Sequence, residues 1–219
     1  MSSAPSSRDK ILDVGEALFA RRGYAGVGMR EVAQASGLGK SSLFHHFRGK
    51  GQLYAEVRVR TLERIRDALA PFLAVETTPL QALEEGMCAL IDSFAEHPTS
   101  ARLLLRGLVE EEIFSGEAPP ELEEAEQILT ELLDDLSRLI ERGVKAGELR
   151  AVAVPDTMQS LIGLVAYHFA SGEMGERILG EALFSSSAVK RRKREVVNFI
   201  REGLRAPRSD REGKGEDST

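Results

Sequence analysis

Residues 28–50 carry the side chains in this chain that are best suited to contact another large molecule. Within a framework of small and apolar residues, the stretch places a cation, two hydroxyls, two imidazoles and an aromatic ring close together. Such a set can donate to and accept from base edges in a DNA major groove, and it can also bind phosphates. The side chains that we expect to point outward are Lys40, Ser41, Ser42, Phe44, His45 and His46.

Two short helices joined by a tight turn are predicted to hold these side chains. Each helix has apolar residues at helical spacing, namely Met29, Val32 and Ala33 in the first and Leu38, Leu43 and Phe47 in the second. The small Ala33 allows the helices to cross closely, and Gly37 gives the backbone freedom that ends the first one. Gly39 follows at the other side of the turn. The pattern predicts a helix-turn-helix.

At these positions the sequence resembles the TetR/AcrR family of bacterial transcription regulators. The resemblance covers roughly the first quarter of the chain. It implies an all-α fold, in which a three-helix domain binds operator DNA, a larger helical domain binds an effector, and two chains pair through their last two helices. The residues that carry it are Arg8, Ile11, Leu12, Ala17, Phe19, Gly23, Tyr24, Arg30, Val32, Ala33, Gly37, Leu38, Lys40, Leu43, His46, Phe47, Lys50 and Leu53.

Some residues of the stretch depart from the family pattern, and each departure removes a hydroxyl. The family commonly has threonine or serine at the positions of Val27 and Gly28. It commonly has serine at the position of Gly39 and tyrosine at that of Phe44. We therefore expect phosphate binding to depend on cations and on helix N-termini. The residues expected at phosphates are Lys50 and His46, and Arg30 is expected at a base edge or a phosphate.

The charge is divided between the two parts of the chain. The protein has a net charge of −6, but residues 1–60 carry a balance of +5 and residues 61–219 a balance of −11. A basic N-terminal unit is attracted to phosphates, while an acidic remainder limits indiscriminate binding. We predict a DNA-binding domain over residues 1–50, a helical effector-binding and dimerisation domain over 51–205, and a disordered tail over 206–219.

The middle of the chain shows helical apolar patterns that we interpret as the surroundings of an effector pocket. Periodicity cannot separate a cavity from an ordinary core, so both interpretations stay open for each residue. Because few charges occur among them, the effector is predicted to be apolar or aromatic. The candidate lining residues are Met87, Ile91, Phe94, Leu104, Leu108, Leu132, Leu164 and His168.

Two apolar helical patterns near the C-terminus are predicted to form a homodimer. One begins at Pro155-Asp156 and is apolar nearly all round, which requires cover on several sides. The other runs from Ala188 to about Leu204. The residues expected at the dimer interface are Leu161, Val165, Phe169, Val196, Phe199 and Ile200.

Other functions find little support in the sequence. Gly39-Lys40-Ser41 resembles the end of a phosphate-binding loop, but Gln34 stands where that motif needs glycine. The adjacent His45 and His46 have no third ligand at metal spacing, and no catalytic set emerges. We expect a cytoplasmic protein that is not an enzyme and has no cofactor, metal or membrane segment. The alternatives are a helical protein-interaction adaptor with no DNA role and an all-helical enzyme.

Overall fold

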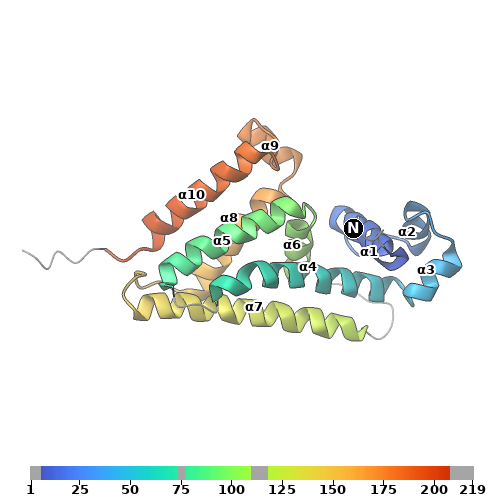
Figure 1. The fold of residues 1–219 in the computed structure, drawn as a ribbon, viewed down its shortest axis with the longest axis horizontal. Helices are drawn as coiled ribbons and strands as arrows, with labels where there is room; N and C mark the ends of the chain where they lie inside the picture. The colour runs from blue at the N-terminus through green and yellow to red at the C-terminus, as the bar shows by residue number, and fades with distance from the viewer. Residues whose placement is uncertain (1–5, 74–76, 110–117, 208–219) are drawn as a thin grey trace, which may run out of the picture.

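The computed structural model describes residues 6–73, 77–109 and 118–207. Apart from one isolated bridge between Leu149 and Arg205, the regular structure of these residues is helical, which confirms the all-α prediction. The helices, shown in Figure 1, are α1 (Ser7–Arg22), α2 (Met29–Ala35), α3 (Lys40–His46), α4 (Lys50–Leu73), α5 (Pro79–Glu96), α6 (Ser100–Val109), α7 (Pro120–Lys145), α8 (Val154–Ala170), α9 (Glu173–Leu179) and α10 (Ser186–Leu204).

Helices α1, α2 and α3 form a small unit at one end of the molecule (Figure 1). Helix α1 begins with a capping box, in which Ser6 Oγ accepts from the amide of Asp9 while the Asp9 carboxylate accepts from the amide of Ser6. Helix α2 ends before Gly37, whose φ of 68° lies in the left-handed region that glycine adopts at little cost. The apolar core of this unit includes Ile11, Phe19, Val32, Leu43, Phe47, Leu53 and Tyr54.

Helix α4 connects this unit to the larger helical body. Its first turns bury Leu53 and Tyr54 in the core of the small unit, while Leu62 and Ile65, farther along, lie in the core of the body. Helix α7 runs beside α4 in the same direction, and α5 packs against both (Figure 1). A displacement of α4 in the body would therefore move residues that support the small unit.

The C-terminal part differs from the sequence prediction in one element, the short helix α9. Its apolar residues Met174 and Ile178 are 55% and 70% exposed, and in this helix only Gly175 is buried. With seven residues, α9 is shorter than the stretch over which an apolar helical period can be recognised. Most of the predicted tail, residues 208–219, lies outside the described residues.

The helices described here include none that is long and apolar enough to cross a lipid bilayer.

Candidate nucleic-acid interface and ligand cavity

Helix α3 presents a mixed polar and aromatic surface to solvent. Lys40, Ser41 and His45 are exposed, Phe44 is 41% exposed, and the Lys40 ammonium lies 5.8 Å from the centre of the Phe44 ring. On the opposite side of the helix Leu43 is fully buried. The helix therefore has one anchored face and one face that another molecule can contact, as recognition helices have.

The other predicted DNA-contact residues lie around this surface in different environments. Arg30 on α2 is exposed, whereas Ser42 and His46 are half-buried at the edge of the α3 face. Lys50 is also half-buried, because its Nζ donates to the Tyr24 carbonyl oxygen at 3.1 Å and lies 4.2 Å from the centre of the Tyr24 ring. Lys50 thus connects the start of α4 to the corner after α1, a role that the sequence did not indicate.

A buried carboxylate holds α1 against the helical body. Glu16, 6% exposed, accepts hydrogen bonds from Arg60, from Arg64 at 2.9 Å and from Thr99, just before α6. Burial raises the pKa of Glu16, but the Thr99 hydrogen bond and the positive charges of Arg64 and Arg60 outweigh it, so the pKa lies below its ordinary value. Glu16 stays ionised and joins three segments.

Sequence reasoning missed the Glu16 cluster, although a signal was present. Glu16 stands beside Gly15 and Ala17, on the helix face that carries Ile11, Leu12 and Phe19, where a charge needs a partner. Arg60 and Arg64 are one helical turn apart on α4 and therefore share a face. A lone acid within an apolar pattern, together with two cations at that spacing, was the available indication.

Helix α6 makes two further polar contacts at the ends of other helices. The Arg106 Nε donates to the Ala20 carbonyl oxygen in the last turn of α1 at 3.2 Å. The Arg102 Nε donates to the Ala170 carbonyl oxygen at the end of α8 at 3.0 Å. Both arginines place a positive charge at a helix C-terminus, where the backbone dipoles favour it.

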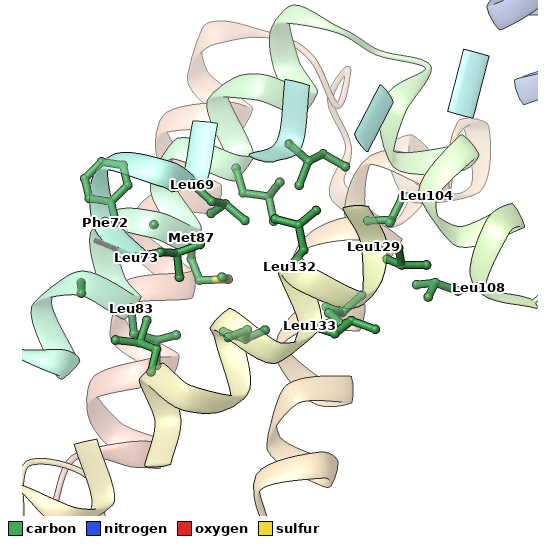
Figure 2. Close-up of a pocket in the computed structure, with 17 residues that line it drawn as sticks. Leu69, Phe72, Leu73, Leu83, Met87, Leu104, Leu108, Leu129, Leu132 and Leu133 are labelled. Atoms are coloured by element: carbon green, nitrogen blue, oxygen red, sulfur yellow. The ribbon is translucent and has the colours of Figure 1, made fainter. Parts of the chain in front are cut away.

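An apolar cavity of about 60 Å³ lies among α4, α5, α6 and α7. Figure 2 shows its lining side chains, which include Leu69, Phe72, Leu73, Leu83, Met87, Leu104, Leu108, Leu129, Leu132 and Leu133. Four of the eight predicted pocket residues line it: Met87, Leu104, Leu108 and Leu132. Ligand pockets usually have about 300–1,000 Å³, so an occupant would have to widen this cavity.

The other four predicted pocket residues lie away from the cavity lining. Ile91 and Phe94 are completely buried in the core of the body, and the Leu164 carbonyl oxygen accepts a hydrogen bond from Arg192. His168 is buried against the Phe169 ring, with 4.8 Å between ring centres. Burial, followed by the positive charges of Arg192 and Arg191, lowers the pKa of His168 to about 4. These four residues are not among those that line the cavity.

The residues predicted for the dimer interface also need correction. Leu161, Val165, Phe169, Val196 and Ile200 are at most 2% exposed, so they pack inside one chain and offer no surface to a second. The sixth residue, Phe199, is 56% exposed on α10. The large apolar residues exposed on α8 and α9 are Tyr167, Met174, Ile178 and Leu179.

A helix-turn-helix with an exposed polar face, joined to a larger helical body, is the architecture of helix-turn-helix transcription regulators. Comparison with known families agrees. Residues 11–57 match the bacterial regulatory proteins of the tetR family, and residues 79–200 match the tetracyclin repressor-like C-terminal domain. The chain belongs to the TetR family, which confirms the resemblance noted in its first quarter.

Relatives and solved structures agree with this assignment over nearly the whole chain. The regulator RutR of Escherichia coli K12 is 28% identical over 209 residues, which are 93% of each chain. The ketosteroid regulator KstR2 of Mycobacterium tuberculosis shares the fold with a TM-score of 0.74 at 16% identity, over 94% of this chain and 98% of that one. PfmR of Thermus thermophilus gives 0.71 at 23% identity, over 93% of this chain and all of the other.

Proposed function

We propose that the protein is a ligand-responsive repressor that binds a palindromic operator as a homodimer and is released by a small apolar effector. The observation that carries this proposal is the placement of α4, which supplies core residues to the DNA-binding unit and lines the cavity in the body. An occupant that widens the cavity must displace α4 or its neighbours. Such a displacement changes the position of α3.

Two copies are needed for this mechanism. In a dimer, two recognition helices enter successive major grooves about 34–36 Å apart, and an effector that alters this spacing weakens both contacts together. The exposed Phe199 and Tyr167, on α10 and α8, are the surface that we assign to the partner copy. A solved structure of AibR, which holds isovaleryl coenzyme A and operator DNA together, supports the combination of ligand and DNA on this fold.

The DNA contacts are divided between bases and phosphates. Lys40, Ser41, Ser42, Phe44 and His45 read bases or lie against them, while Arg30, His46 and Lys50 contribute phosphate contacts, and Arg30 can also reach a base edge. Replacing Lys50 by alanine is expected to weaken binding to all sequences alike. Ser42→Ala or His45→Ala is expected to change the preference among operators. Equal losses on every operator for all three variants would contradict this division.

The test is fluorescence anisotropy of the pure protein with random duplexes and with duplexes from upstream of its own gene, at low and physiological salt. Removing one phosphate-binding cation per protomer by Arg30→Ala is expected to reduce the slope of log affinity against log salt by roughly 2 per dimer. Lys145→Ala is the matched control, because this exposed lysine ends α7 in the helical body. Sequence-selective binding that Lys145→Ala leaves unchanged supports the proposal.

The alternative function is a protein-interaction adaptor in which the helix-turn-helix serves only packing. An apolar protein interface depends little on salt, whereas phosphate binding declines steeply with it. If the folded, dimeric protein binds no duplex selectively at either salt concentration, the repressor proposal is refuted in favour of the adaptor.

A further inference from the structure

The first turn of α4 carries a glutamine whose amide contacts three separate parts of the chain. The Gln52 Oε1 accepts a hydrogen bond from the Arg48 amide at 2.8 Å, and its Nε2 donates to Glu56 at 3.1 Å and to Glu121 at 3.0 Å. Arg48 lies in the corner between α3 and α4, Glu56 is one turn farther along α4, and Glu121 is in the first turn of α7. One side chain therefore joins the end of the recognition helix to the helical body.

These contacts allow the Gln52 amide only one orientation. A side-chain amide has two N–H donors and one acceptor oxygen. With Nε2 toward the two carboxylates, both donors meet acceptors, and the oxygen meets the Arg48 amide. The reversed amide would place its oxygen against Glu56 and Glu121 and its NH2 against an N–H group, so every contact would be lost. The orientation of Gln52 is thus fixed by α4 and α7 together.

The corner that Gln52 contacts is also held from α1. Phe47, the C-cap of α3, is completely buried, and the Arg8 guanidinium lies 5.2 Å from the centre of its ring. Arg8 also pairs with Glu56, one of the two carboxylates that Gln52 contacts. Burial and the negative charge of Glu121 outweigh the positive charge of Arg8, so the pKa of Glu56 lies above its ordinary value. Without the Gln52 donors, the two acids would repel each other.

Helix capping alone would explain part of this arrangement. Gln52 is the third residue of α4, where a glutamine side chain commonly accepts from an amide at the helix start. A cap of this kind accounts for the contact with Arg48, but it requires no contact with α7. The two explanations differ in what they expect of Glu121, which is half-buried, while Glu123 in the same turn is exposed.

We propose that Gln52 and Glu121 form a bridge by which α7 holds the corner after α3, and with it the recognition helix, in the orientation that binds DNA. The inference rests on the proposed function, because it names residues that position the DNA-binding helix. Both are positioning residues, which act through the corner and not by contact with a base. A corner that is fixed in advance does not have to be ordered when DNA binds, so the bridge raises operator affinity by pre-organisation.

Fluorescence anisotropy with a duplex from upstream of its own gene that the wild type binds selectively separates the bridge from the effect of charge. Glu121→Leu removes the acceptor. Glu123→Leu removes the same charge from the same first turn of α7, with the same interaction with the helix dipole. Loss of a negative charge alone should strengthen DNA binding in both variants. The bridge instead predicts that Glu121→Leu binds roughly three- to tenfold more weakly than Glu123→Leu, because only Glu121→Leu breaks a hydrogen bond to a charged group.

An exchange of the two side chains tests the bridge at constant net charge. Gln52→Glu keeps an acceptor for the Arg48 amide, and therefore the cap, but places a third carboxylate against Glu56 and Glu121. It is expected to weaken operator binding by roughly tenfold or more. Gln52→Glu/Glu121→Gln again places a donor opposite an acceptor and is expected to recover most of this loss. Gln52→Glu/Glu123→Gln has the same net charge without the bridge and is expected to recover little. If Gln52→Glu does not fold, Glu121→Leu and Glu123→Leu still decide.

Hydrogen exchange of the Arg48 amide, measured without DNA, reports on the corner itself. It is expected to be roughly three- to tenfold faster in Glu121→Leu than in the wild type, and unchanged in Glu123→Leu. Equal exchange at Arg48 and equal operator affinity in these two variants would refute the bridge, leave Gln52 as a local cap and leave the repressor proposal standing. If the wild type binds no duplex selectively, the repressor is refuted, and the exchange alone decides whether α7 holds the corner.

Discussion

Replacing Glu16 by glutamine should loosen the attachment of the DNA-binding unit to the helical body. The substitution keeps the size of the side chain and an acceptor oxygen but removes the charge that faces Arg60 and Arg64. Thr99 keeps a possible hydrogen-bond partner. The main loss is therefore electrostatic, and it falls on the contact between α1 and α4.

The stability lost in Glu16→Gln lies between the cost of breaking a buried ion pair and the cost of breaking an exposed one. Removing one partner of a fully buried pair costs about 3–5 kcal/mol, whereas exposed pairs are worth about 0.2–1 kcal/mol. Here the carboxylate side chain is 8% exposed, but the side chains of Arg60 and Arg64 are 21% and 24% exposed and can partly turn to water. We expect a loss of about 2 kcal/mol, which lowers the melting temperature by roughly 4–8 °C.

The loss of stability in Glu16→Gln should depend on pH and should become smaller in acid. Because the pKa of Glu16 is lowered on folding, its charge stabilises the folded protein above the ordinary value of 4.5. This contribution decreases as pH falls below 4.5 through the folded pKa. Urea unfolding of the wild type and Glu16→Gln, at equal protein concentration, should therefore show a difference that is constant from neutral pH to about pH 5 and shrinks below it.

Asp13→Asn is the matched control for this prediction. Asp13 is also on α1 and pairs with the same Arg60 at 2.8 Å, but its side chain is 63% exposed. Asp13→Asn should lower the free energy of unfolding by no more than about 0.5 kcal/mol. The reasoning is refuted if Glu16→Gln costs no more than Asp13→Asn, or if its cost stays constant as the pH falls well below 4.5.

Three other predictions concern the helix ends, the partner surface and the turn. Arg106→Ala removes a cap from the last turn of α1, so hydrogen exchange there should accelerate while α3 exchanges as before. Phe199→Glu should weaken the dimer roughly ten- to hundredfold in sedimentation experiments, whereas Val109→Glu, on α6, should not. Gly37→Ala, at a φ of 68°, should cost about 1–2 kcal/mol in urea unfolding, whereas Gly163→Ala, inside α8 with nothing within 4 Å of its added Cβ, should stabilise.

Local chemistry allowed the helix-turn-helix and the two C-terminal helices to be predicted from the sequence. Their apolar spacing depends on residues a few positions apart. Gly37 was recognised for the same reason, since a turn that needs positive φ selects glycine. Information of this kind is contained in short segments, so it does not require the tertiary fold.

The lining of the cavity could not be predicted in this way. Leu132 and Ile91 both occupy apolar helical positions, yet Leu132 borders the cavity and Ile91 lies in filled core. The difference depends on how four helices cross, which no single helical period encodes. Helix α8 presents the same difficulty: a helix that is apolar nearly all round has no marked face, so its buried Val165 and its exposed Tyr167 could not be distinguished.

Helix α6 offers a second connection, beside α4, between the cavity and the DNA-binding unit. Its successive residues Leu103 and Leu104 belong to different cores, the first to that of the small unit and the second to the surroundings of the cavity. Arg106 holds the end of α1, and Arg102 holds the end of α8. Because close-packed interiors transmit displacement, an occupant that pushes Leu104 and Leu108 must move Leu103 and Arg106 with them. In the proposed function, the coupling between the cavity and the DNA-binding unit therefore requires only this ten-residue helix and the shared length of α4.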